Sequence, residues 1–220
     1  MAGSTAPRRY RGVTVEERAA TRRERLMEAG LEVFGTHGYA GSSVRSVCAE
    51  ASLNPRYFYE SFTSREDLLY HVYLRIVTDI ANDAAKAVAE ADSIEAQARA
   101  GLRAGWLLLT SDPRKARVVA IEVVGVSDRL EQLRRATRHA LADMTVRNAM
   151  SIAAEGTRLR LDPVLTARAL IGGVVELLSD WIHGDVDAPP EVVVEHLTRI
   201  FEAAARAAVD TGAANTGAAD

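Results

Sequence analysis

Three prolines, each preceded by a residue that favours the N-cap of a helix, divide much of this chain into helical segments. The pairs are Asn54-Pro55, Asp112-Pro113 and Asp162-Pro163. Proline sacrifices no hydrogen bond at the first helical position, and the preceding Asn or Asp side chain can accept a free backbone N–H group. Each pair therefore predicts the start of a helix.

Two further helix starts and the spacing of apolar residues complete the predicted fold. Capping-box spacing occurs at Thr14-x-x-Glu17 and at Thr63-x-x-Glu66. Apolar residues recur about every 3.6 positions, and no alternating run is long enough to predict a strand. Gly38 is expected to end the first helix in the left-handed conformation. We therefore expect an all-α fold with helices near residues 15–36, 43–50, 54–60, 64–90, 93–110, 113–125, 128–155, 163–183 and 189–208.

The composition excludes several classes of protein. The single cysteine, Cys48, excludes a disulfide scaffold and a cysteine-rich zinc site, and it indicates a reducing compartment. The first residues lack the apolar run of a signal peptide, and no run of about 18 apolar residues is present to span a membrane. The composition therefore predicts a cytoplasmic protein.

The net charge of −3 argues against nucleic-acid binding until the chain is divided. Residues 1–65 hold ten Lys and Arg against seven Asp and Glu, whereas residues 66–220 hold seventeen against twenty-three. The amino-terminal part is thus basic and the remainder acidic. Basic residues clustered in one part of a chain favour contact with nucleic acid there.

The expected helices at 43–50 and 54–60 are too short to be stable without tertiary packing. Val44, Val47 and Cys48 form an apolar stripe on the first, and Leu53 and Phe58 continue it across the turn. This arrangement matches a helix-turn-helix. From spacing alone, a tight corner in an unrelated helical protein is an equal alternative.

The side chains expected on the outer face of these two helices decide between the alternatives. Arg and Asn can bond base edges, and hydroxyl groups can hold phosphates. A helix N-terminus also attracts phosphate. The outward residues are Ser43, Arg45, Asn54, Pro55, Arg56 and Tyr57, with Arg65 in the first turn of the next helix.

Residues 33–39 (VFGTHGY) and 42–66 resemble the TetR family of repressors. The resemblance extends over about residues 15–75. Two departures occur, because Arg56-Tyr57 replaces the small Gly-Thr usual in the recognition helix and Arg65 replaces the usual lysine. The bulkier pair changes the expected operator sequence and leaves the expectation of DNA binding intact.

The resemblance implies a role for each matching position. Arg45, Pro55, Arg56 and Tyr57 would face base edges, whereas Ser43, Tyr59 and Arg65 would hold the phosphate backbone. The alternative for Tyr59 is a half-buried packing ring. Residues 1–14, with Arg8, Arg9 and Arg11, would form a flexible basic arm that follows the DNA or remains in solvent.

The resemblance also divides the chain into parts. Residues 15–65 would form the DNA-binding domain, residues 66–210 an effector-binding and dimerisation domain, and residues 211–220 a frayed tail. The last two long helices would pair with their copies in a four-helix bundle. Gly172 and Gly173 lie within the first of them, where a close approach of helices would offset their cost of roughly 1 kcal/mol each.

The last helix carries an apolar stripe wide enough for a partner, or for burial in a monomer. The stripe consists of Val192, Val193, His196, Leu197, Ile200 and Phe201. Between the preceding helices, six residues could line an effector cavity or simply form the core. These residues are Tyr73, Trp106, Leu109, Val123, His139 and Met144. Few basic residues are expected at buried positions there, which favours a lipophilic or neutral effector over a polyanion.

The chain has none of the motifs that indicate an enzyme. A glycine-rich phosphate loop, a nucleophile elbow and a His-Glu-x-x-His zinc motif are all missing, so we expect no catalysis, cofactor or metal. We therefore expect a homodimeric transcriptional regulator, a repressor released from a palindromic operator by a small effector, with helix 64–90 as the lever. The alternative is a helical carrier or interaction protein whose helix-turn-helix no longer binds DNA.

Overall fold

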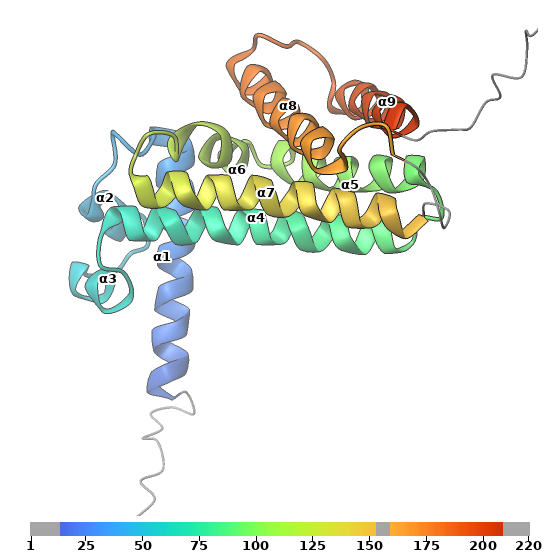
Figure 1. The fold of residues 1–220 in the computed structure, drawn as a ribbon. Coiled ribbons are helices and arrows are strands. Elements are labelled where there is room, and N and C mark those ends of the chain that lie inside the picture. The colour runs from blue at the N-terminus through green and yellow to red at the C-terminus, as the bar shows by residue number, and fades with distance from the viewer. Residues whose placement is uncertain (1–13, 153–158, 209–220) are drawn as a thin grey trace, which may run out of the picture.

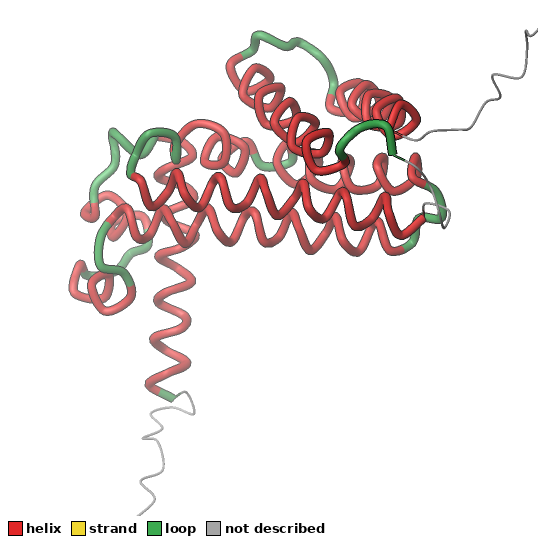
Figure 2. Tube along the Cα trace, viewed as in Figure 1, coloured by secondary structure: helices red, strands yellow, loops and turns green. Residues whose placement is uncertain are grey.

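The computed structural model of the chain describes residues 14–152 and 159–208. Within these ranges it contains nine α-helices, one turn of π-helix and no β-strand (Figure 2). The prediction of an all-α fold is confirmed. The basic arm with Arg8, Arg9 and Arg11 and the tail at 211–220 lie outside the described residues.

The first three helices pack around one small apolar core. They are α1 (Val15–His37), α2 (Val44–Glu50) and α3 (Pro55–Ser61). α1 begins with the predicted capping box, in which Thr14 Oγ1 accepts the Glu17 N–H at 3.1 Å and Glu17 Oε2 accepts the Thr14 N–H at 2.6 Å. The shared core consists of fully or nearly fully buried side chains of Leu26, Val33, Phe34, Val47, Cys48, Phe58 and Phe62.

Three long helices form the body of the molecule, and two more pack across one side of it (Figure 1). The long helices are α4 (Arg65–Ala89), α5 (Ile94–Thr110) and α7 (Asp128–Ile152). The helices across them are α8 (Pro163–His183) and α9 (Pro190–Ala208). α1 crosses the end of this layer and projects away from it, so α2 and α3 lie at one end of the molecule.

All three predicted proline helix starts are confirmed, with Asn54 as the cap of α3, and the start predicted at Thr63 is displaced by one residue. Asp112 and Asp162 both cap helices that begin with proline. The cap of α4 is Ser64, whose hydroxyl accepts the Asp67 N–H at 3.0 Å, and not Thr63. The Thr63 N–H instead donates to Asp67 Oδ2 at 3.0 Å.

The segment predicted as one helix at 113–125 is divided in two. It consists of α6 (Pro113–Arg117) and the π-helical turn η1 (Val118–Glu122). Residues 118–121 are all apolar, so their pattern contains no signal for a change of helical period. A π-helical turn is rare and often occurs at a functional position.

The conformation of Gly38 also differs from the expectation. Its φ of 79° is positive, as predicted, but its ψ of 154° lies outside the left-handed helical region. The chain therefore leaves α1 in an extended direction, toward η1, and does not close a helical cap of the expected kind.

α1 and α6 meet without room for a side chain between them. A Cβ atom at Gly35 would lie 2.7 Å from Cα of Arg114. The Arg114 guanidinium pairs with Asp112 at 2.8 Å and with Glu32 of α1 at 2.6 Å. These bonds raise the pKa of Arg114 and, chiefly through the Arg114 hydrogen bond, lower that of Asp112. α6 is thereby joined to the helix that supports α2 and α3.

Candidate DNA interface and ligand cavity

α2 and α3 present a polar face to solvent at the end of the molecule. Six of the eight residues predicted to contact DNA are exposed, and Tyr57 and Arg65 are partly buried. Caps hold both helices, since Ser43 and Ser46 bond reciprocally and Asn54 Oδ1 accepts the Arg56 N–H at 2.9 Å. The six exposed residues are Ser43, Arg45, Asn54, Pro55, Arg56 and Tyr59.

Arg56 and Tyr57 take part only in weak surface interactions. The Arg56 side chain is 83% exposed, and its Nε lies 3.3 Å from Glu60. The guanidinium of Arg22 lies 4.5 Å from the centre of the Tyr57 ring. Exposed ion pairs of this kind contribute at most about 1 kcal/mol. Arg56 can therefore exchange Glu60 for a base edge at small cost.

Tyr59 is not the half-buried packing ring that was the alternative for it. Its side chain is 64% exposed, and its ring lies nearly perpendicular to that of Phe58, with ring centres 5.4 Å apart. Its hydroxyl has no hydrogen-bond partner within the described part of the chain. An exposed tyrosine hydroxyl on α3 has the chemistry to bond a phosphate.

Arg65 has structural partners that the sequence did not predict. Its Nη1 donates to the backbone carbonyl of Tyr39 at 2.8 Å and to the carbonyl of Ser42, and its guanidinium lies 4.1 Å from the centre of the Tyr39 ring. Arg65 therefore connects the start of α4 with the loop between α1 and α2. Its other guanidinium nitrogens remain available for a phosphate.

Glu122 connects η1 with the same loop. Its Oε2 accepts the backbone N–H of Tyr39 at 2.6 Å, and its Oε1 accepts Nε of Arg117 at 2.7 Å. A Cβ at Gly38 would lie 3.2 Å from Glu122 Oε2, so a larger residue would crowd the carboxylate. Sequence reasoning missed Glu122, because nothing in the local pattern indicates a partner 83 positions away.

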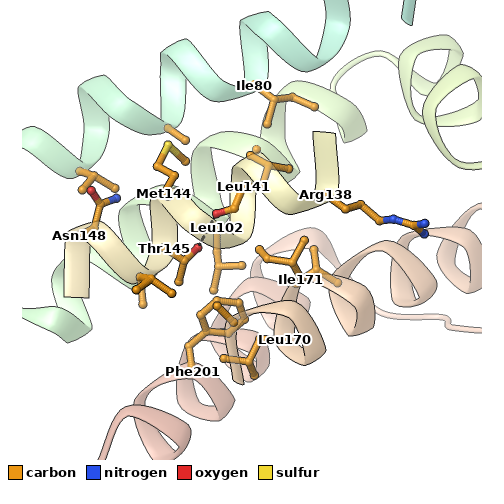
Figure 3. Close-up of a pocket in the computed structure, with 18 of the residues that line it drawn as sticks. Ile80, Leu102, Arg138, Leu141, Met144, Thr145, Asn148, Leu170, Ile171 and Phe201 are labelled. Atoms are coloured by element: carbon orange, nitrogen blue, oxygen red, sulfur yellow. Dashed lines mark hydrogen bonds between the residues drawn. The ribbon is translucent and has the colours of Figure 1, made fainter. Parts of the chain in front are cut away.

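A cavity of about 260 Å³ lies among α4, α5, α7, α8 and α9 (Figure 3). Of the six residues proposed from the sequence, Tyr73, Trp106, Leu109 and Met144 lie on its wall, whereas Val123 and His139 do not. Val123 is fully buried in the core instead. The sequence did not predict the other wall residues for the cavity, which include Ile80, Leu102 and Leu141 on the same three helices and Leu170, Ile171 and Phe201 on α8 and α9.

Tyr73, Arg134, Thr137 and Arg138 form one polar group on this mainly apolar wall. Burial raises the pKa of Tyr73, although Thr137, Arg134 and Arg138 act in the opposite direction. Arg134 pairs with Glu131 at 2.7 Å. Arg138 has no ion pair with any described residue, and its side chain points away from the apolar residues of the wall (Figure 3).

The outer faces of α8 and α9 lack cover within the single chain. The predicted stripe on α9 divides into two rows, because Val193, Leu197 and Phe201 are buried whereas Val192, His196 and Ile200 are exposed. On α8, both Gly172 and Gly173 are exposed, and a Cβ at either would meet nothing within 4 Å.

Neither a metal site nor a membrane-spanning helix occurs in the described part of the chain. Residues 14–152 and 159–208 contain no group of three or more His, Cys, Asp and Glu side chains that could hold a metal ion. No helix among the described residues is long and apolar enough to cross a membrane. Cys48 is buried, which raises the pKa of its thiol and fits the predicted packing role.

Comparison with known proteins agrees with the helix-turn-helix and with the fold. The family model for bacterial regulatory proteins of the TetR family matches residues 26–72. No curated protein matches the chain. A TetR-family transcriptional regulator from Syntrophomonas wolfei is 16% identical, with a TM-score of 0.72, and the match covers 90% of this chain and 99% of that one.

Two other similar structures contain ligands. The transcriptional regulator FadR from Bacillus subtilis, in complex with stearoyl-CoA, is 18% identical over 81% of this chain and 96% of its own, with a TM-score of 0.70. AibR, in complex with isovaleryl coenzyme A and operator DNA, is 17% identical over 81% of this chain and 97% of its own, with a TM-score of 0.64. These identities show a common fold. The family match runs from α1 into α4, so this part of the chain has the helix-turn-helix of the TetR family of bacterial regulatory proteins.

Proposed function

We propose that this regulator is a homodimeric repressor that binds a palindromic operator in the cytoplasm and leaves it when a small lipophilic effector enters the cavity. The exposed polar face of α3 carries the proposal. Arg56 and Asn54 have the chemistry to read base edges, and neither has a role in the core. Around them, Ser43, Tyr59 and the free nitrogens of Arg65 are suited to phosphates.

The uncovered faces of α8 and α9 support dimerisation. Gly172 and Gly173 weaken an isolated helix by roughly 1 kcal/mol each relative to alanine, and the single chain contains no contact that offsets this cost. Packing against a second copy explains both the glycines and the exposed row of Val192 and Ile200. A two-fold dimer presents its two α3 helices to half-sites about one helical turn apart.

The wall of the cavity supports an acyl compound as effector. Apolar side chains from five helices surround the space, which suits a hydrocarbon chain. Arg138 supplies an unpaired cation beside it, suited to an acidic head group that extends from the cavity. FadR and AibR, whose structures contain stearoyl-CoA and isovaleryl coenzyme A, have the same fold and support this class of ligand.

Two connections can transmit the presence of the effector to the DNA-binding helices. α4 extends from the cavity, at Tyr73, to Arg65 beside the α1–α2 loop. Val119 of η1 lines the cavity wall, and Glu122 of η1 accepts a hydrogen bond from Tyr39 in the same loop. An effector shifts the conformational equilibrium only by its difference in affinity for the two states, and a change from 1:99 to 99:1 needs about 5.5 kcal/mol.

A mobility-shift assay tests the proposal against the helical carrier that no longer binds DNA. The purified protein is mixed with DNA from upstream of its own reading frame, at low salt. A repressor retards the migration of this DNA and releases the DNA when stearoyl-CoA or another acyl thioester is added. A carrier binds the acyl compound and retards no DNA, and that result would end the repressor proposal.

A further inference from the structure

Two side chains that line the cavity each contain a buried polar atom with no hydrogen-bond partner among the residues that the structure describes. They are Nε1 of Trp106 and Oε1 of Gln97, and both side chains line the cavity. A buried donor or acceptor without a partner destabilises the folded chain, so such atoms are few in native proteins. Of the three such atoms among the described residues, two belong to side chains on the wall of this one cavity and the third, Oε1 of Glu202, does not, so a molecule bound in the cavity is a candidate partner for the first two.

The neighbouring tryptophan provides an internal comparison. Trp181 lies with its ring centre 6.3 Å from that of Trp106, and its Nε1 donates to the carbonyl of Ala188 at 3.0 Å. Trp181 does not line the cavity. The chain therefore satisfies the indole that lies outside the cavity and leaves unsatisfied the one that forms its wall.

The two atoms lie toward opposite ends of the cavity. α5 runs antiparallel to α4, since Gly105 packs on Ile80 and Gly101 on Val88. Trp106 is therefore on the Tyr73 side, where Arg138 also lies, whereas Gln97 is beyond Gly101 at the far end. Nine residues of helix separate them by roughly 13 Å along its axis.

Their chemistry is complementary. Indole Nε1 is only a donor, and the amide Oε1 is only an acceptor. A ligand that satisfies both needs an acceptor oxygen near its head group and a hydroxyl or N–H donor toward its distal end. A hydrocarbon chain that ends in a methyl group satisfies Trp106 alone.

We infer that the effector is an acyl compound with a polar distal end, whose head-group oxygen accepts the Trp106 indole N–H and whose distal hydroxyl or amide donates to Gln97. The inference rests on the proposed acyl effector and specifies the substituent that this chain selects. In this arrangement Arg138 binds the acidic head group of the effector, and Trp106 donates to the adjoining oxygen. Gln97 accepts a hydrogen bond from the distal end. The apolar wall between them holds the hydrocarbon.

A titration with matched fatty acids tests the selection. The chain has two tryptophans, Trp106 and Trp181, so the intrinsic fluorescence of the full-length protein reports on the cavity. The probes are ω-hydroxy fatty acids from octanoic to hexadecanoic acid and the unsubstituted acids of equal length. At the best length, the hydroxylated acid should bind at least tenfold more tightly than its unsubstituted partner.

Two amide variants decide whether Gln97 is responsible for the preference. Gln97→Leu removes the acceptor and should bring the affinities of the two acids to within a factor of two. Gln132→Leu removes an amide from the exposed face of α7 and should keep the wild-type preference. An equal preference in Q97L and wild type, or no preference in wild type, overturns the inference.

Two tryptophan variants test the other end, with the remaining tryptophan as reporter. Trp106→Phe keeps a ring but removes the donor, and should weaken both acids about tenfold. Trp181→Phe should leave both affinities unchanged. Circular dichroism checks folding, and if W106F does not fold, the Q97L comparison decides alone.

Failure of this inference is distinguishable from failure of the proposed function. If neither series of acids binds, the inference is overturned, while retardation of operator DNA still supports the repressor. If the preference for the hydroxylated acid holds and no DNA is retarded, the ligand assignment stands and the repressor proposal fails.

Discussion

The Glu122 carboxylate accepts the backbone N–H of Tyr39 at 2.6 Å across 83 positions of sequence. The bond joins the π-helical turn η1 to the loop that precedes α2. Arg65 donates to the carbonyl of the same Tyr39, so this residue receives contacts from both η1 and the start of α4. Val119 of η1 lines the cavity, and Glu122 of η1 contacts the loop before α2. We therefore expect a displacement of η1 to be transmitted to α2 and α3 through this loop.

Glu122→Ala should uncouple the effector from the DNA. The variant leaves the Tyr39 N–H without its partner and should lower the free energy of unfolding by about 1–3 kcal/mol. Operator affinity should change little, while the effector concentration needed for release rises severalfold. Urea denaturation and mobility shifts with added acyl-CoA measure both effects. Glu90→Ala, at an exposed position after α4, is the control, and an unchanged release curve in E122A contradicts the coupling.

Arg56→Ala should weaken binding to the operator by about 1–3 kcal/mol and relax the preference at one base position. The physical reason is the loss of a guanidinium that can bond a base edge in two places. Fluorescence anisotropy measures the affinity of the variant for a panel of operators that each differ by a single base. Arg103→Ala removes an exposed arginine of α5 and should match wild type. A uniform loss across the panel would assign Arg56 to the phosphate backbone.

Arg65→Ala should weaken operator and unrelated DNA alike. A lost phosphate contact lowers the number of released counterions, so the plot of log affinity against log salt becomes flatter by about one unit. Titrations at several salt concentrations measure this slope. The variant also loses the hydrogen bonds to the carbonyls of Tyr39 and Ser42, and its melting temperature measures the resulting loss of stability. An unaltered slope with reduced stability would assign Arg65 a structural role alone.

Gly172→Leu should dissociate the dimer without unfolding the chain. A Cβ at this position meets nothing within 4 Å of the same chain, but a leucine would obstruct close packing against a second copy. Sedimentation equilibrium should show a dissociation constant at least tenfold above that of wild type. Ala136→Leu adds similar bulk to an exposed face of α7 and is the control. A G172L protein that dimerises normally would exclude this face as the interface.

Asp112→Asn should flatten the acid side of the stability profile. The Arg114 hydrogen bond lowers the pKa of Asp112, so its stabilisation is complete above the pKa of the unfolded chain, near 4, and is lost as the pH falls through the lower folded value. Asparagine still caps α6 but has no charge. Urea denaturation should show wild type more stable at pH 7 and the two proteins converging in acid. A constant difference at all pH values contradicts this linkage, and Asp185→Asn, at an exposed position, is the control.

Local signals predicted the fold well because helix starts depend on neighbouring residues. Pro55, Pro113 and Pro163 each begin a helix behind the expected cap. Local pattern also predicted the buried side chains of Val47, Cys48 and Phe58 on α2 and α3, since a stripe of apolar residues needs only helical periodicity. The π-helical turn was missed because four consecutive apolar residues suit either helical period.

The contacts between distant elements could not be predicted in the same way. Val123 and His139 have the chemistry of cavity residues, but the crossing of helices directs them elsewhere. Glu122 and Gln97 were not singled out, because an exposed acid or amide and a buried one look alike in sequence. Their roles depend on where α5, η1 and the α1–α2 loop meet.

A footprint on the DNA upstream of the reading frame tests the central claim most directly. DNase I digestion with the purified protein should reveal two protected half-sites related by two-fold symmetry, with centres about one helical turn apart. Addition of the effector, with an acyl-CoA or ω-hydroxy acid as probe, should remove both together. Protection that is missing at low salt, or that persists at saturating effector, would contradict a ligand-released repressor.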